Sequence, residues 1–207
     1  MNTPKDAIVW IDCEMTGLDV ETDALIEIAV IVTDSELNAV DAGIDVVIAP
    51  PAAALESMVD VVRQMHTTSG LLDELGHGLS MEEAQRQVMD YHHRHVPNAR
   101  KVPLAGNSVG TDRVFLERNM PDVVSHLHYR VIDVSSIKEL ARRWYPRAYF
   151  ASPEKTGGHR ALADILESIA ELRYYRAVLF PRDGGPDIET CREIARQLAD
   201  GPTSTHG

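Results

Sequence analysis

Short apolar runs rich in β-branched residues dominate the first quarter of the chain. They predict strands over residues 7–15, 25–33 and 44–49, each apolar enough to lie inside a sheet. Turn-forming residues at 34–38 separate the second run from the third. Connections this short predict antiparallel pairing, because a parallel return needs a crossover of a dozen or more residues.

The pattern becomes helical after Pro50-Pro51. Ser80 and Glu83 have the spacing of a capping box, which predicts a helix from there to about His93. Further helices are predicted over 112–119, 135–144, 159–178 and 187–198, and short strands over 101–106 and 130–134.

Three strands followed by alternating helices and strands indicate the α/β class. We expect a single domain over residues 1–200, with a mixed five-stranded sheet flanked by helices. Residues 201–207 are expected to form a flexible C-terminal tail.

The chain of 207 residues carries 20 lysines and arginines against 32 acidic residues, a formal net charge of −12. This balance argues against a protein that binds long DNA or RNA, and against a basic membrane-surface protein. Two cysteines are too few for a disulfide scaffold. No signal-peptide pattern begins the chain, and no apolar run reaches the ~18 residues of a membrane span. We therefore expect a soluble, cytoplasmic protein without a membrane partner.

Two acidic residues interrupt the first apolar run. Asp12 and Glu14 lie two apart on the predicted strand, so their side chains leave the same face, whereas Ile11 and Cys13 point the other way. Carboxylates paired on a buried strand repel each other and lose solvation, so they need a cation. On an edge strand both would simply be solvated, and this pair alone leaves both interpretations open.

Three further residues have ordinary structural explanations when each is taken alone. Asp112 follows a glycine-containing loop and suits the first turn of a helix, where the macrodipole favours an acid. Asp164 borders the apolar stripe of the longest helix, beside Leu166, and fits an exposed helix acid. His159 follows Gly157-Gly158 and fits the start of that helix.

Taken together, these residues resemble the three motifs of the DEDDh 3′→5′ exonuclease family. The segments concerned are 10–18 (WIDCEMTGL), 107–116 (NSVGTDRVFL) and 159–164 (HRALAD), with the histidine five residues before the last acid. Residues 65–71, 128–134 and 169–175 are similar to the oligoribonucleases within that family. The resemblance runs from about residue 7 to residue 180.

The resemblance implies a ribonuclease-H-like fold and a 3′→5′ exoribonuclease. Such an enzyme hydrolyses very short RNA, chiefly dinucleotides, to nucleoside 5′-monophosphates in the final step of RNA degradation. By motif match, two Mg²⁺ or Mn²⁺ ions would be held by four catalytic carboxylates, those of Asp12, Glu14, Asp112 and Asp164. His159 would be the general base, since an imidazole titrates near neutral pH.

The resemblance also implies substrate-binding residues and a second subunit. Leu18 would wedge against the terminal bases, and the 5′ end of a short substrate would meet His66, Ser108, Tyr129 and Arg130. The last two would come from the partner in a homodimer. Groups that close around a 5′ phosphate would favour dinucleotides over long nucleic acid. Without the resemblance, Tyr129 and Arg130 would be a strand start and a surface charge.

The chain departs from the family pattern at two positions. Ala163 stands where an acid is often found, but the carried-over metal ligand is the next residue, Asp164, so we expect the site to be intact. Val61 stands where relatives carry a tryptophan that can stack on a base, a contact worth roughly 1–3 kcal/mol. This second departure bears on how the substrate is held and leaves the chemistry unaffected.

The histidine-rich segment 91–95 (YHHRH) and Cys13 are the remaining candidates. His92 and His95 look like metal ligands, but at a helix end a solvated face is the better interpretation. Cys13 lies beside the acids, yet it points to the opposite face and is expected to be a small buried hydrophobe.

Two alternative functions remain. A broader DEDDh exonuclease that trims RNA or proofreads DNA would need basic patches for a longer strand, which a net charge of −12 does little to support. An inactive nucleic-acid-binding or dimerisation module on the same fold would not need all four acids and the histidine.

Overall fold

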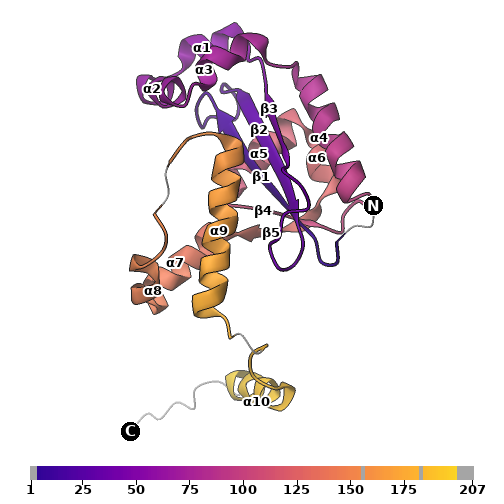
Figure 1. Cartoon of the computed structure of the whole chain (residues 1–207), viewed down its shortest axis with the longest axis vertical. Coiled ribbons are helices and arrows are strands. Elements are labelled where there is room, and N and C mark those ends of the chain that lie inside the picture. Colours follow the sequence, from indigo (N-terminus) through magenta and orange to yellow (C-terminus); the bar gives the residue numbers. More distant parts are fainter. Residues whose placement is uncertain (1–3, 155–156, 182–183, 200–207) are drawn as a thin grey trace.

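A computed structural model describes residues 4–154, 157–181 and 184–199, so the predicted tail lies outside the described residues. Within them, five strands form one mixed sheet in the order β3-β2-β1-β4-β5 (Figure 1). The strands are β1 (Ile8–Met15), β2 (Leu25–Thr33), β3 (Ile44–Val47), β4 (Pro103–Gly106) and β5 (His128–Asp133). β1, β2 and β3 form an antiparallel meander, and β4 and β5 run parallel to β1. The predicted α/β class and mixed five-stranded sheet are confirmed.

The described part of the chain contains ten α-helices. They are α1 (Ala52–Ser57), α2 (Asp60–Thr68), α3 (Leu71–Glu74), α4 (Met81–His95), α5 (Gly110–Asn119), α6 (Pro121–His126), α7 (Val134–Trp144), α8 (Pro146–Phe150), α9 (Ala161–Leu179) and α10 (Ile188–Ala199). A short 3₁₀ turn, Leu75–His77, follows α3.

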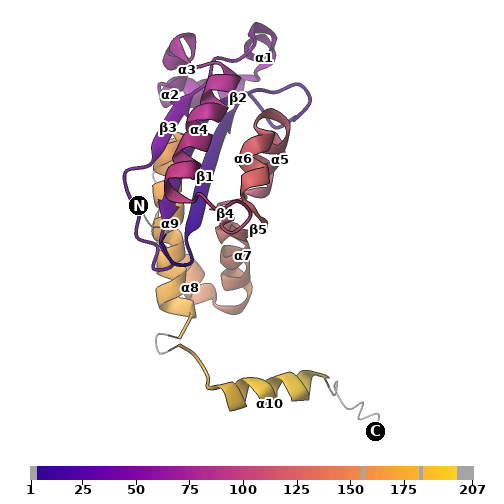
Figure 2. The same ribbon diagram turned by 90° about the vertical axis from the view of Figure 1, so that its right-hand side faces the viewer.

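The sheet separates two apolar cores, as the strand period of two requires. Val9 and Ile11 of β1 pack on one face with α4 and α6. Ile8 and Trp10 pack on the other face with α7 and α9 (Figures 1 and 2). Continuation of this alternation directs the residues at positions 12 and 14 toward the α9 face.

The helix α4 begins as its sequence predicts. The Ser80 hydroxyl accepts a hydrogen bond from the Glu83 N–H at 3.2 Å, which satisfies one of the unpaired donors at the helix start. The helices α6 and α8 were not predicted from the pattern. Each begins at a proline, a residue that suits the first helical position. Each helix is only one or two turns long, which is too short to give a periodic pattern in the sequence.

The longest helix, α9, begins at Ala161 rather than at residue 159. His159 has a backbone φ of 47°, in the left-handed region, and therefore cannot belong to the helix. Leu166, assigned to the apolar stripe of this helix, is 53% exposed, so that part of the expected stripe is wrong. The stripe residues Ile165, Ile169 and Leu172 are buried.

The predicted final helix is present as α10, which extends away from the sheet (Figures 1 and 2). Ile188, Ile194 and Leu198 share its apolar side and are exposed. Among the described residues, no helix is both long and apolar enough to cross a membrane.

Candidate active site

Two acids of β1 lie on the α9 face of the sheet. β1 is flanked by β2 and β4, so the alternative of an edge strand with solvated acids is wrong. Glu14 is 8% exposed, and Asp12, two residues earlier, is partly buried. The cross-strand neighbour of Glu14 on β2 is another acid, Glu27, which is fully buried. Such a concentration of carboxylates inside a sheet needs compensating cations or hydrogen bonds.

Asp112 reaches β1 from the first turn of α5. Its Oδ1 accepts a hydrogen bond from the backbone N–H of Cys13 at 3.0 Å, and its side chain is buried. This bond joins residues 99 positions apart and fixes the carboxylate against β1 between Asp12 and Glu14. Asp112 is therefore more than a helix-start acid. Cys13 is a buried residue, as its position on the strand predicts.

The start of α9 supplies the remaining two groups. One ligand atom each of Glu14, His159 and Asp164 lies within 4.8 Å of the others. His159 is exposed, whereas Asp164 is half-buried in the first turn of the helix. The interpretation of Asp164 as an ordinary exposed helix acid is wrong, because its carboxylate faces β1. Ala163 is exposed and, as the neighbour of Asp164 in the helix, points in a different direction. An acid at position 163 would therefore not take the place of the Asp164 carboxylate.

Burial and mutual repulsion raise the pKa values of three of these carboxyl groups. Desolvation raises the pKa of Asp12 from 3.8 to about 9, and repulsion from Asp112 and Asp164 adds to the effect. Desolvation, followed by repulsion from Asp164, raises the pKa of Glu14 to about 8. Burial also raises the pKa of Asp112 to about 6, against the opposing hydrogen bond from Cys13.

This donor set fits hard divalent cations. Carboxylate oxygens are the ligands that Mg²⁺ and Mn²⁺ prefer in proteins. The pKa values of Asp12 and Glu14, raised to about 9 and about 8, show that nearby positive charge does not offset burial and repulsion there, and a divalent cation in the cluster would replace their protons. Four residues could hold such ions: Asp12, Glu14, Asp112 and Asp164.

Sequence patterns alone did not identify three charged residues that lie around the cluster, namely Glu27, Glu74 and Arg160. The Arg160 guanidinium donates from Nε to Glu27 Oε1 at 2.8 Å and from Nη1 to Glu74 Oε1 at 2.7 Å. One signal was available, because Glu27 is a single acid inside the apolar run 25–33. Its partner could not be found from the pattern, since 133 positions separate Arg160 from Glu27.

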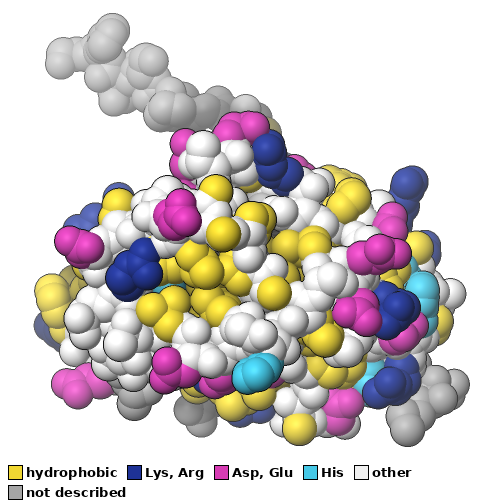
Figure 3. Space-filling view, turned by 90° about the horizontal axis from the view of Figure 1, so that it is seen from above, with side chains coloured by type: hydrophobic (Ala, Val, Ile, Leu, Met, Phe, Trp, Pro, Cys, Tyr) yellow, Lys and Arg dark blue, Asp and Glu magenta, His cyan; other side chains and the backbone are white. Residues whose placement is uncertain are grey.

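Two of the predicted substrate-binding residues lie at the same end of the sheet as the acids. Leu18, in the loop after β1, is 79% exposed. Ser108 follows β4 with a left-handed φ of 52°, and its N–H donates to Asp133 Oδ1 at 3.0 Å. Figure 3 looks onto the end of the molecule that carries α1 to α3, where apolar side chains occupy the centre and charged ones the rim. The exposed apolar residues of α2 and its N-cap are Val61 and Val59.

His66 lies beside the cluster but is fully buried in α2. Its Nε2 is 2.9 Å from the Met15 carbonyl oxygen, and its Nδ1 is 3.9 Å from Glu14 Oε2. A contact between His66 and a substrate would require α2 to move, and this contact stays a prediction.

Tyr129 and Arg130 lie away from the cluster, at the start of β5. Both side chains are exposed, and the Arg130 guanidinium lies 5.5 Å from the centre of the Tyr129 ring. Asp133, the neighbour of Ser108, lies four positions after Tyr129 along the strand, which corresponds to about 13 Å at ~3.3 Å per residue. The carboxyl ends of β4 and β5 meet where Gly106 pairs with Asp133, beside Ser108, whereas Tyr129 lies near the opposite end of β5. Tyr129 and Arg130 therefore do not join the site of their own chain.

The histidines at the end of α4 are not a solvated face, so that expectation is wrong. His92 is fully buried, and its ring stacks on His126 of α6 with 5.5 Å between centroids. His95 is 7% exposed and lies 3.1 Å from Asp41 Oδ2. Burial lowers the pKa of His92 to about 3. No metal-ligand group in the described part of the chain includes these histidines.

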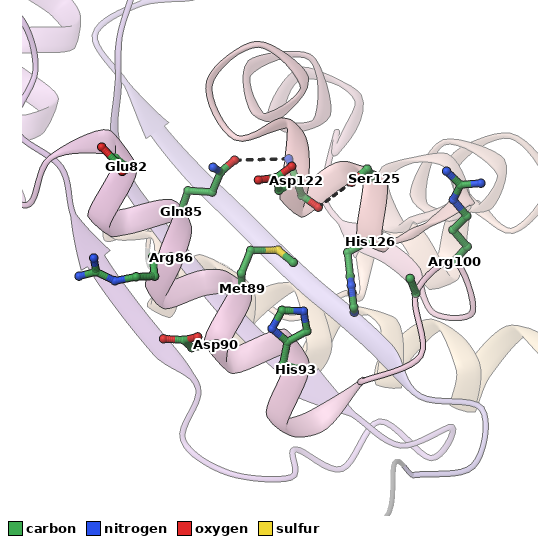
Figure 4. Close-up of a pocket in the computed structure, with 11 residues that line it drawn as sticks. Glu82, Gln85, Arg86, Met89, Asp90, His93, Arg100, Asp122, Ser125 and His126 are labelled. Carbon is green, nitrogen blue, oxygen red and sulfur yellow. Dashed lines mark hydrogen bonds between the residues drawn. The ribbon is translucent and has the colours of Figure 1, made fainter.

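A separate cavity of 690 Å³ lies between α4 and α6 (Figure 4). Met89 and His93 of α4 face His126 of α6 across it, and Arg86 and Arg100 lie at its border. These helices cover the face of the sheet opposite α9, so the cavity is distinct from the acidic cluster.

Comparison with known proteins gives the family of the chain. The sequence profile of the exonuclease family matches residues 9–172. An oligoribonuclease of Streptomyces avermitilis is 64% identical over 191 residues, which cover 92% of this chain and 96% of the relative. The chain belongs to the oligoribonucleases. A further oligoribonuclease, of Leifsonia xyli subsp. xyli, is 55% identical over 207 residues and covers the whole of both chains.

Solved structures support the fold of this oligoribonuclease-family chain. Exonuclease I of E. coli in complex with a 5cy-dT13 oligonucleotide superimposes with a TM-score of 0.60 at 18% identity. Exonuclease I of Methylocaldum szegediense gives a TM-score of 0.57 at 20% identity. Each match covers 84% of this chain, which spans 41% of the length of either solved chain. The solved structures confirm the expected fold, and the exonuclease profile and the oligoribonuclease relatives confirm the identification as a nuclease.

Proposed function

We propose that the chain is a 3′→5′ exoribonuclease that hydrolyses very short RNA, chiefly dinucleotides, to nucleoside 5′-monophosphates. It would complete RNA degradation in the cytoplasm. One observation carries the proposal: three elements distant in sequence bring four carboxyl groups and His159 together at one end of the sheet. Membership of the oligoribonucleases supports RNA as the substrate.

The site would take two divalent cations, Mg²⁺ or Mn²⁺, on four carboxylates. The ligands would be Asp12, Glu14, Asp112 and Asp164. When bound, such ions activate water and stabilise the charge that develops on the leaving 3′ oxygen of a phosphodiester. The raised pKa values of Asp12 and Glu14 support this assignment, because burial and mutual repulsion there outweigh any nearby positive charge.

His159 would accept the proton of the attacking water. Its exposed side chain lies next to Glu14 and Asp164, so a proton acceptor stands at the mouth of the acidic cluster. The product would leave with the phosphate on its 5′ oxygen. Leu18 would pack against the bases, and Ser108 would contact the 5′ end of a short substrate.

Charge and surface support a short substrate. A net charge of −12 offers little attraction to a long polyanion. The end of the molecule near α1 to α3 presents apolar side chains that suit bases better than phosphates (Figure 3). A dinucleotide brings only one or two phosphates, which the ions and a few local groups could hold.

A homodimer would complete the substrate site. Tyr129 and Arg130 are exposed near the start of the edge strand β5, at the end of the strand away from Ser108 and the acids of their own chain. A second copy could bring these two residues to the 5′ end of a substrate, which His66 and Ser108 of the first chain would also contact. This arrangement would set the preferred length, because a longer RNA would collide with the partner's side chains.

Rates of cleavage on a length series test the proposal. The substrates are 5′-phosphorylated RNAs of two to about ten nucleotides, each with Mg²⁺ and with EDTA. We expect metal-dependent release of nucleoside monophosphates that is fastest for the dinucleotide. A flat length profile would favour a broader exonuclease, and the absence of metal-dependent cleavage would favour an inactive binding module.

A further inference from the structure

The backbone that carries His159 is held in an uncommon conformation. Its φ of 47° lies in the left-handed region, which non-glycine residues seldom adopt without support from their surroundings. Gly157 has a φ of 63°, and a Cβ added at Gly157 or Gly158 would meet no described atom within 4 Å. On the C-terminal side of His159, by contrast, the described residues make several close contacts.

Arg160, the next residue, is held by two carboxylates from different elements. Its Nε and Nη2 lie 2.8 Å and 2.7 Å from Glu27 Oε1 on β2. Its Nη1 and Nη2 donate to the two oxygens of Glu74 on α3, at 2.7 Å and 3.1 Å. A planar guanidinium bound on two sides fixes both the position and the rotation of the side chain. We call Glu27, Arg160 and Glu74 the Arg160 clamp.

The clamp extends to the main chain on the other side of Arg160. The second oxygen of Glu27, Oε2, accepts a hydrogen bond from the Ala161 N–H at 2.9 Å. Glu27 is fully buried, and it is the cross-strand partner of Glu14 in the β1–β2 register. One carboxylate thus ties the turn after His159 to the strand position that faces Glu14.

We propose that Arg160 is a positioning residue that, through Glu27 and Glu74, fixes the imidazole of His159 over Glu14 and Asp164. This inference deepens the proposed function and rests on it. The clamp couples three separate elements, so its effect on the histidine goes beyond closing the first turn of α9. Catalytic groups lose much of their effect when they are displaced by about 1 Å, which is the movement that a loosened turn allows.

Arg160→Lys tests the clamp while it keeps a positive charge beside the buried Glu27. Lysine cannot bind two carboxylates with a planar fork. We expect kcat on a 5′-phosphorylated RNA dinucleotide to fall between about tenfold and about 10²-fold, with KM changed by less than about threefold. In a His159→Ala background the same substitution should leave kcat unchanged, because the group that it positions is already absent. Losses that multiply in the double variant would overturn the proposal.

A readout independent of activity separates this inference from the proposed function. Hydrogen–deuterium exchange of residues 157–164 should become faster in Arg160→Lys than in the wild-type chain. Unchanged exchange would overturn the clamp even if activity fell. If the wild-type chain cleaves no RNA, the proposed function fails, and exchange alone still decides the clamp.

Two further variants complete the test. Glu74→Ala removes the outer carboxylate, leaves Arg160 paired with Glu27, and should lower kcat about threefold to tenfold with the same faster exchange. Glu36→Ala is the matched control, since it breaks an exposed arginine–glutamate pair of 2.7 Å to Arg176, far along α9. Its kcat and its exchange at 157–164 should equal those of the wild type. If Arg160→Lys does not fold, unchanged values in Glu74→Ala would overturn the proposal.

Discussion

The carboxyl groups of Asp12, Glu14 and Asp112 are in an environment that opposes their charge. Each is mostly removed from water, and their negative charges would lie close together. The neighbouring Arg160 already binds Glu27 and Glu74, so it compensates other acids first. A site of this kind stores unfavourable electrostatic energy when metal-free, and a cation releases it.

This environment predicts how the stability of the metal-free protein depends on pH. The pKa of Asp12 is about 9 in the folded chain against an ordinary value of 3.8, so the folded state binds more protons than the unfolded state between these limits. The free energy of unfolding should therefore fall as pH rises from 7 to 9. Mg²⁺ should raise Tm more at pH 9 than at pH 7, because fewer protons compete for the ligands.

Thermal unfolding in EDTA and in Mg²⁺ at both pH values measures this effect. Asp12→Asn is the control, because it removes one of the titrating groups and should reduce the pH dependence, leaving the part that Glu14 contributes. A metal-free Tm that is constant or rises from pH 7 to 9 in the wild-type chain would contradict the assignment.

Backbone conformation at single residues was beyond reach of the sequence. Ser108 and His159 both have positive φ values, and both lie at the candidate site. Serine and histidine do not by themselves predict a positive φ. The conformation results from tertiary contacts, such as the hydrogen bond from the Ser108 N–H to Asp133. Motif resemblance, by contrast, placed both residues at the site without any knowledge of their geometry.

At the level of elements, local patterns were good predictors of the long strands and helices. β2 matches its predicted range, and α4 begins at the predicted cap. Where contacts between elements determine whether a side chain is buried, the local sequence pattern does not predict the burial. His92 and His95 are buried because the end of α4 packs against α6 and lies beside Asp41. Asp41 lies more than 50 positions before these histidines in the chain.

The cap of α4 gives a stability prediction. Ser80→Ala removes the acceptor of the Glu83 N–H, which should cost about 1 kcal/mol. For a chain of this size, such a loss corresponds to a Tm lower by about 2–4 °C. Differential scanning calorimetry measures the shift. Ser35→Ala, in the exposed turn after β2, is the matched control. Equal Tm values for the two variants would show that the cap contributes nothing.

At the scale of the whole molecule, one chain contains the acidic cluster but not all of the expected substrate contacts. Tyr129 and Arg130 project from the edge strand β5, whose unpaired backbone edge also suits contact with another chain. The sequence could not locate them relative to the cluster, because that requires the order and direction of the strands. The proposed homodimer follows from this geometry together with the family resemblance.

A mixed-dimer experiment tests whether Tyr129 acts on the partner's site. Tyr129→Ala should preserve the dimer in light scattering and lower kcat/KM on a dinucleotide by at least about tenfold. A chain carrying Asp164→Asn is expected to be inactive, because it lacks one of the proposed metal ligands. Refolding the two variants together should restore activity, because the Tyr129→Ala chain keeps its acids and receives Tyr129 from its partner. Absence of restoration in a verified mixed dimer would contradict the arrangement.

The central claim is that the carboxylates between β1 and α9 form the metal-dependent catalytic site. The most direct measurement is the rate of nucleoside 5′-monophosphate release from a 5′-phosphorylated RNA dinucleotide in Mg²⁺, for the wild-type chain and for Asp164→Asn. We predict steady release by the wild type that EDTA abolishes, and a rate at least about 10³-fold lower in Asp164→Asn at an unchanged or higher Tm. Wild-type rates in a folded Asp164→Asn chain would contradict the account.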